Sequence, residues 1–187
     1  MNGVTGIVLA GGQGRRMGGV DKGLQLLHGK PMVAHVIARL VPQANEILIN
    51  ANQNLDVYAR FGYRVVPDAV DGFAGPLAGL HAGLSAASHP LALTVPCDSP
   101  FLPLDLVARL MKALKENDLA VARTGKQPHP VFSLVRASVL DHLAKFLAVG
   151  GRKIDAWYAT LEVVEVSFDD EADAFRNINT REELDNA

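Results

Sequence analysis

Glycines and cationic side chains gather directly behind an apolar stretch near the start of the chain. Between Gly11 and Lys22 the sequence holds five glycines, two arginines and one lysine, and residues 6–10 before them are apolar. Glycine lets the backbone approach a ligand closely, so successive amide groups can converge on an anion whose charge the cationic side chains neutralise. A buried strand that leads into such a loop predicts a binding site for the phosphates of a nucleotide.

Polar residues also stand where three later strands are expected to end. Asn50, Asp68 and Asp98 each follow a short apolar run, as Gly11 follows the first one. In open α/β sheets, ligands bind beyond the carboxyl ends of the strands, because these ends meet at one edge. We therefore expect all four residues to line the same edge of a sheet.

The elements that must position these residues alternate along the first two thirds of the chain. Short apolar runs are typical of buried strands, and the longer segments between them carry a helical period. Strands are predicted at residues 6–10, 46–50, 63–66, 91–95 and 119–123, and helices at 31–40, 54–61, 76–87 and 103–116. The inward-facing residues of the last helix are predicted to be Leu106, Leu110, Met111 and Leu114.

The final third of the chain has a different pattern. Residues 124–130 are typical of a hairpin loop that leads into a strand at 131–135, so antiparallel pairing is expected there. The remaining elements are predicted to be helices at 137–149 and 154–159, a strand at 161–166 and a short terminal helix from the capping box at 180–183. We therefore expect a single α/β domain over residues 1–187, a three-layer sandwich whose mostly parallel sheet has antiparallel strands in its C-terminal half.

The composition excludes several classes of protein. The 187 residues are 49% apolar and 20% charged, with a net charge of −2, which argues against a general binder of nucleic acids or membrane surfaces. The single cysteine, Cys97, can form no internal disulfide and has no neighbouring residue that would complete a metal site. No apolar run approaches the roughly 18 residues of a membrane helix, and no secretion signal is recognisable, so a soluble cytoplasmic protein is expected.

Two familiar phosphate-binding motifs do not fit. A dinucleotide fingerprint needs a third glycine where Met17 stands, and an acidic residue where Asn50 stands. A P-loop needs serine or threonine after Gly-Lys, but the two Gly-Lys pairs of this chain are followed by Pro31 and Gln127. The glycine-rich loop must therefore belong to another kind of nucleotide site.

Residues 9–22 read Leu-Ala-Gly-Gly-Gln-Gly-Arg-Arg-Met-Gly-Gly-Val-Asp-Lys. This string resembles the signature of nucleotidyltransferases, and most closely that of the MobA family of molybdenum cofactor guanylyltransferases. Further matches follow in the order of that family: Gly-Pro-Leu-Ala-Gly at 75–79, Pro-Cys-Asp-Ser-Pro at 96–100, His-Pro at 129–130 and Asn-Ile-Asn-Thr at 177–180. The resemblance covers essentially the whole chain, with one departure at Arg181, where the family often has proline.

The resemblance implies a Rossmann-like nucleotidyltransferase fold of the GT-A-like kind. The implied reaction transfers GMP from GTP to the terminal phosphate of Mo-molybdopterin, with Mg²⁺ as the cofactor and pyrophosphate as the second product. Residues 1–100 would bind GTP and residues 101–187 the pterin. The implied partners beyond GTP and Mo-molybdopterin are proteins of molybdenum insertion and molybdoenzyme maturation, met transiently by a monomeric enzyme that binds neither nucleic acid nor membrane.

The same resemblance assigns roles to individual residues. The implied catalytic residues are Lys22, Arg16 and Asp98, with Asp98 as the metal ligand. The implied nucleotide-binding residues are Leu9, Ala10, Gly11, Lys22, Asn50, Asp68 and Asp98. The candidates for the pterin are Asn179, His129 and Gly79, with Lys126 and Arg152 as further cations, and the role of Arg15 stays open.

Three alternatives remain open from the sequence. A cytidylyltransferase acting on molybdopterin would keep the fold and change only the base. A nucleotidyltransferase for a sugar phosphate or an isoprenoid precursor would keep the chemistry and change the acceptor. A non-catalytic module that binds a nucleotide and carries the cofactor would keep the phosphate loop without turnover.

Overall fold

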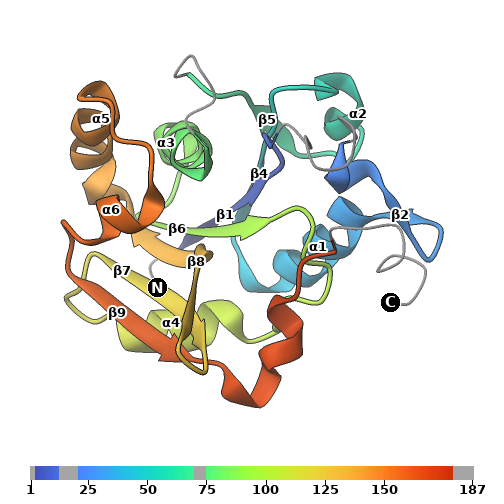
Figure 1. Cartoon of the computed structure of the whole chain (residues 1–187). Coiled ribbons are helices and arrows are strands. Elements are labelled where there is room, and N and C mark those ends of the chain that lie inside the picture. The colour runs from blue at the N-terminus through green and yellow to red at the C-terminus, as the bar shows by residue number, and fades with distance from the viewer. Residues whose placement is uncertain (1–2, 13–20, 70–74, 179–187) are drawn as a thin grey trace.

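Apolar, β-branched segments form a seven-stranded sheet at the centre of the computed structural model, which describes residues 3–12, 21–69 and 75–178 (Figure 1). The strand order is β5-β4-β1-β6-β8-β7-β9, and β8 alone in this sheet runs against its neighbours. The strands are β1 (Val4–Leu9), β4 (Glu46–Asn50), β5 (Arg64–Val66), β6 (Leu91–Pro96), β7 (Leu119–Thr124), β8 (Gln127–Arg136) and β9 (Val163–Ser167). The expected mostly parallel sheet is confirmed, and its antiparallel pairs both involve β8.

Helices cover both faces of the sheet and complete the expected three layers. Successive residues of a strand point to opposite faces, so Val8 packs into one apolar cluster and Ile7 into the other. The cluster around Val8 includes α1 (Met32–Leu40) and α4 (Leu106–Leu114). The cluster around Ile7 includes α3 (Pro76–Ala86), α5 (Leu140–Ala148) and α6 (Ile154–Tyr158). The short helix α2 (Leu55–Ala59) adds Tyr58 to the first cluster.

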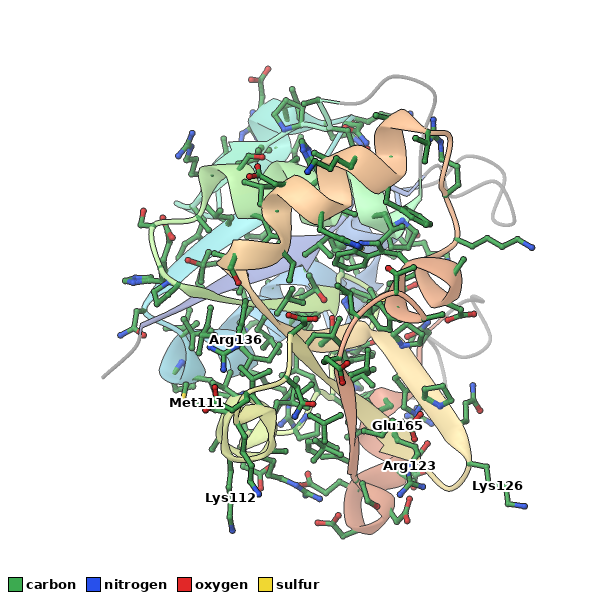
Figure 2. All side chains as sticks on the ribbon, turned by 90° about the vertical axis from the view of Figure 1, so that its left-hand side faces the viewer. Met111, Lys112, Arg123, Lys126, Arg136 and Glu165 are labelled. Atoms are coloured by element: carbon green, nitrogen blue, oxygen red, sulfur yellow. The ribbon has the colours of Figure 1, made fainter. Side chains whose placement is uncertain are left out.

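Helix α4 differs from its prediction in two ways. It begins at Leu106, three residues later than predicted, and Met111 is 39% exposed instead of facing inward. Val107 is buried in place of Met111, so the buried side of this helix is formed by residues 106, 107, 110 and 114. Figure 2 shows Met111 beside Lys112 on the outer side of the helix.

The connection between β7 and β8 is shorter than predicted. Only Gly125 and Lys126 form the turn, and β8 already begins at Gln127. The prediction of a loop rested on prolines, which cannot donate a hydrogen bond within a sheet. Pro130 lies where the β7–β8 register shifts, between the pairs Val121–Ser133 and Ala122–His129. Pro128 pairs with Arg123 in the part of β8 that has no pairing with β6. His129 therefore lies in a strand and not in a loop, which corrects its prediction.

The sequence pattern did not predict several short elements. A two-stranded hairpin, β2 (Leu26–Leu27) and β3 (Lys30–Pro31), turns through His28 and Gly29, which both have positive φ. One-turn 3₁₀ helices η2 (Lys22–Leu24), η3 (Val41–Gln43) and η4 (Ala137–Val139), and the longer η5 (Asp169–Phe175), were not predicted as such. Among the described helices, none has the length and apolar character to cross a membrane.

Candidate active site

The ends of three neighbouring strands meet at one edge of the sheet. Leu9, the last residue of β1, pairs with Asn50 at the end of β4 and with Pro96 at the end of β6. The backbone continues this contact beyond the sheet, because the amide of Ala10 donates to the carbonyl of Asn50 at 2.7 Å. The predicted meeting of the strand ends at one edge is therefore confirmed, and it brings residues 11, 50, 68 and 98 to the same side of the molecule.

Asn50 and Asp68 form a hydrogen-bonded network with a residue that the sequence did not indicate, Asn52. The Asn50 amide donates to Asp68 Oδ1 at 2.8 Å and to the carbonyl of Val66 at 3.1 Å. Asn52 donates to Asp68 Oδ2 at 2.8 Å and to the Gly11 carbonyl at 3.3 Å, and it accepts from the Asp68 amide at 2.9 Å. Asn52 thus holds the carboxylate in place.

The alternating pattern of a strand offers a signal for Asn52. It stands two positions after Asn50, and residues two apart in an extended chain point to the same face. Two asparagines in that relation at a strand end are a recognisable pattern. What the sequence could not show is that both amides converge on the carboxylate of Asp68.

Gly79 lies on α3 directly against this network. A Cβ atom at this position would overlap Asn50 Oδ1 and approach Leu9 Cδ2 to 2.8 Å. Because Gly79 is buried in this contact, close helix packing explains the absence of a side chain there. A contact of Gly79 with substrate stays a prediction.

Lys22 and Asp98 form an ion pair at the same edge. Lys22 Nζ lies 3.3 Å from Asp98 Oδ2, and the two side chains are 22% and 11% exposed. Lys22 begins the 3₁₀ turn η2, and Asp98 follows β6 in the turn around Cys97. The pair places a cation, which could neutralise an anion, beside a carboxylate, the kind of hard oxygen ligand that Mg²⁺ prefers.

The chain segment before residue 179 packs onto the Asp98 turn. The amide of Ile178 donates to the Asp98 carbonyl at 2.9 Å, and Ser99 Oγ donates to Asn177 Oδ1 at 2.5 Å. These bonds bring the end of the described chain to the metal-ligand candidate. Asn179 itself, like Arg15 and Arg16, lies outside the described residues, so their roles stay predictions.

The donor set at Asp98 fits Mg²⁺. Within residues 3–12, 21–69 and 75–178 there is no group of three or more His, Cys, Asp or Glu side chains that could hold a metal. Mg²⁺ is commonly bound by one or two carboxylates together with water and substrate phosphate oxygens, so a complete protein cage is not required. Asp98, a largely buried carboxylate at the edge where the strands end, satisfies that chemistry.

His129 lies on the antiparallel strand β8, opposite Ala122 near the end of β7. Its Nε2 lies 2.7 Å from Thr124 Oγ1, and its ring stacks on Phe175 with centroids 4.8 Å apart. Burial lowers the pKa of His129 below the ordinary value, which favours the neutral ring near pH 7. The prediction of a lone histidine in a loop was therefore wrong, because His129 lies in a strand and contacts a hydroxyl group and an aromatic ring.

The other candidate groups have clear local surroundings. Lys126 is exposed at the tip of the β7–β8 turn, as Figure 2 shows. Arg152 donates to the carbonyls of Leu147 and Gly151, at 2.9 and 2.7 Å, and so caps the end of α5. Cys97 is buried, and burial together with the neighbouring Asp98 raises its thiol pKa, so it is a small apolar residue and no nucleophile.

Comparisons with known proteins identify the family to which this chain is similar. The MobA-like NTP transferase domain matches residues 6–163. A molybdenum cofactor guanylyltransferase from Ralstonia nicotianae is 54% identical over 192 residues, which cover 97% of this chain and 94% of the relative. One from Shewanella putrefaciens is 50% identical over 182 residues, covering 96% of this chain and 93% of the relative.

Solved structures show the same architecture. The crystal structure of molybdopterin-guanine dinucleotide biosynthesis protein A from Archaeoglobus fulgidus superposes with a TM-score of 0.82 at 26% identity, over 97% of this chain and 95% of that one. The 4-diphosphocytidyl-2C-methyl-D-erythritol synthase from Anaerococcus prevotii has a TM-score of 0.76 at 14% identity, over 100% of this chain and 96% of that one. The second likeness concerns the fold alone. With the family domain matched over residues 6–163 and relatives about half identical along nearly the whole chain, this protein belongs to the MobA-like NTP transferases.

Proposed function

We propose that this chain is a molybdenum cofactor guanylyltransferase, which transfers GMP from GTP to the terminal phosphate of Mo-molybdopterin. The names and the high identity of the relatives support this function. The structural observation that carries it is the pairing of Lys22 with Asp98 at the strand ends, beside the Asn50–Asp68 network. A cation, a metal-ligand candidate and a polar nucleoside-binding group stand at one edge.

The transfer is a single displacement at the α-phosphorus of GTP. A terminal phosphate oxygen of the pterin forms a bond to this phosphorus, the bond to the bridging oxygen of the β-phosphate breaks, and pyrophosphate leaves with the bonding electrons. Such a reaction depends on in-line positioning and on stabilising charge, and it needs no protein nucleophile. The buried, protonated Cys97 agrees with this requirement.

Lys22 supplies positive charge to the triphosphate, together with Arg16 in the glycine-rich loop. The lysine ammonium acts as a compact charge, whereas the arginine fork can donate two parallel hydrogen bonds to phosphate oxygens. Leu9, Ala10 and Gly11 contribute backbone groups where β1 ends. These residues form the phosphate half of the site.

Asn50 and Asp68 bind the nucleoside of GTP. Both hydrogens of the Asn50 amide are engaged by Val66 and Asp68, which leaves its oxygen as the acceptor. The Asp68 carboxylate is fixed by Asn50 and Asn52 and retains further lone pairs. The pair therefore suits hydrogen-bond donors of the nucleoside, which are the ribose hydroxyls and the N–H groups of guanine.

Asp98 would hold Mg²⁺ through its carboxylate. When bound, the ion supplies positive charge that stabilises the phosphates during transfer. Asn179 either adds an oxygen ligand or contacts the pterin. His129, presented by β8, also belongs to the pterin side, so that residues 1–100 serve GTP and residues 101–187 serve the acceptor.

The decisive experiment measures pyrophosphate release with Mo-molybdopterin and each of GTP, CTP and ATP, with and without Mg²⁺. We expect release with GTP and Mg²⁺, and none after the metal is removed. Preference for CTP contradicts the guanylyl assignment. Binding of GTP and Mg²⁺ without release of pyrophosphate indicates a carrier and contradicts an enzyme.

A further inference from the structure

The residue before Lys22, Asp21, has its carboxylate held from two directions. The Tyr58 hydroxyl donates to Asp21 Oδ1 at 2.6 Å, and the Asn54 amide donates to Asp21 Oδ2 at 3.0 Å. The two donors stand 37 and 33 positions further along the chain, at α2 and at the residue before it. The hydrogen bonds therefore tie the backbone beside Lys22 to a distant element.

The residue after Lys22, Gly23, is fixed as well. A Cβ atom on Gly23 would lie 2.5 Å from the Tyr58 hydroxyl oxygen and 3.2 Å from Cys97 Sγ. Only a glycine leaves room for the tyrosine hydroxyl to pass over the backbone and reach Asp21. Because Cys97 directly precedes Asp98, this packing also sets Lys22 against the turn that carries its ion-pair partner.

Tyr58 is suited to be a permanent donor. Its side chain is fully buried in the apolar cluster that also contains Cys97. Burial and the negative groups nearby raise its pKa, so the hydroxyl keeps its proton across the physiological range. A hydrogen bond from a neutral donor to a carboxylate is stronger than one between two neutral groups.

We propose that Asp21 is a positioning residue which, through Tyr58 and Asn54, holds the backbone of Lys22 so that its ammonium reaches the triphosphate beside Asp98. The inference rests on the role of Lys22 in the proposed function. A lysine side chain has four flexible carbons, so its placement depends on a fixed backbone. Nothing in this role requires the negative charge of Asp21, because an amide oxygen can also accept the tyrosine hydrogen bond.

The test compares Tyr58→Phe, Asp21→Ala and Asp21→Asn with the wild type. Kinetic constants are measured with GTP and Mo-molybdopterin, GTP affinity by calorimetric titration without the pterin, and stability by thermal unfolding. The matched control is Tyr158→Phe, which removes a buried hydroxyl from the other apolar cluster. This hydroxyl donates to the Pro130 carbonyl and lies 2.8 Å from Ser133 Oγ. Two further variants, Lys22→Ala alone and Lys22→Ala combined with Tyr58→Phe, test whether the two residues are coupled.

We expect Tyr58→Phe and Asp21→Ala to lower kcat/KM for GTP and to weaken GTP binding by about 10-fold, since small misplacements of a charged group cost this much or more. Asp21→Asn is expected to stay within about 2-fold of wild type, because Asn54 can turn its amide to accept from the new side chain. In the Lys22→Ala background, Tyr58→Phe should have little further effect, since coupled residues are not additive.

Two results overturn the proposal. In the first, Tyr58→Phe behaves like Tyr158→Phe and changes only the unfolding temperature. In the second, Asp21→Asn is as impaired as Asp21→Ala, which makes the charge itself essential. A wild-type chain that binds GTP but releases no pyrophosphate contradicts the proposed function alone, and the GTP affinities of the same variants still decide the role of Asp21.

Discussion

At the scale of single residues, the candidate site depends on a few charged atoms whose surroundings exclude most of the solvent. Asp98 is 8% exposed and pairs with Lys22, so its charge acts in a region less screened than the surface. His129 combines partial burial with a hydroxyl partner and an aromatic stack. The surroundings of Asp98 and of His129 each lead to a testable prediction.

Replacing Asp98 with alanine tests the metal role. We expect pyrophosphate release to slow on the order of 10²- to 10⁵-fold, because a charge stabiliser of the transition state is removed. Asp105→Ala serves as the control, since Asp105 lies before α4, is 53% exposed in its side chain and pairs only at 3.9 Å with Arg109. Turnover close to wild type in Asp98→Ala would refute metal binding by this residue.

The lowered pKa of His129 predicts a dependence of stability on pH. Its folded-state pKa lies below the unfolded value of about 6.5, so the unfolded chain takes up the proton first as the pH falls. Its contribution to stability is therefore complete above that value and decreases as the pH drops through it. In urea unfolding, wild type should lose more stability between pH 8 and pH 5.5 than His129→Gln does. Equal losses would show that the histidine is not perturbed.

At the scale of elements, the distance of α3 from the sheet is set by Gly79 against Asn50. Gly79→Ala is expected to destabilise the fold by about 1–3 kcal/mol, since an added methyl group in a tight contact forces shifts. The same change should weaken GTP binding, because Asn50 must move. Ser85→Ala, at an exposed site of the same helix, is the control. An unchanged urea midpoint for Gly79→Ala would show that the contact is loose.

Regular elements follow from the local pattern, whereas contacts between them do not. A short apolar run predicts β4 with its observed bounds, Glu46–Asn50, and helical spacing of apolar residues predicts α4 to within three residues. The hydrogen bonds of Asn52, the packing of Gly79 and the approach of Tyr58 to Asp21 depend on segments far apart in sequence. Periodicity carries no information on contacts between distant segments. The sequence therefore predicts that the strand ends share one edge of the sheet, but not which side chains contact one another there.

The β7–β8 hairpin shows a second limit of local reasoning. Prolines at positions 128 and 130 are typical of a loop, yet both occur inside β8. Pro130 lies in the register shift, and Pro128 lies in the part of β8 that pairs with β7 alone, so neither proline interrupts the pairing of β8 with β6. The strand in turn joins β9 to the sheet through β7, where Arg123 and Glu165 pair at 3.4 Å (Figure 2). A change of hydrogen-bonding register is a tertiary property, which residue types alone do not indicate.

At the scale of the whole molecule, ligand binding and folding are linked. A ligand that binds only the folded chain stabilises it, so the proposed substrate GTP, added with Mg²⁺ at 100 times its dissociation constant, should stabilise the protein by about 2.7 kcal/mol. The shift is measured as the change of urea midpoint with GTP concentration. Lys22→Ala and Asp98→Ala should show a smaller shift at the same concentration. Equal shifts in all three proteins would place the GTP phosphates elsewhere.

The hydrogen bond from the Ile178 amide to the Asp98 carbonyl connects the last described residue to a turn 80 positions earlier in the sequence. During synthesis, the strands and the Asp98 turn are made before residues 177 and 178, which hydrogen-bond to that turn. A nascent chain can therefore assemble the strands around β1 before these hydrogen bonds exist. A polypeptide that stops before residue 177 would form the strands around β1 without the two hydrogen bonds that residues 177 and 178 make to the Asp98 turn.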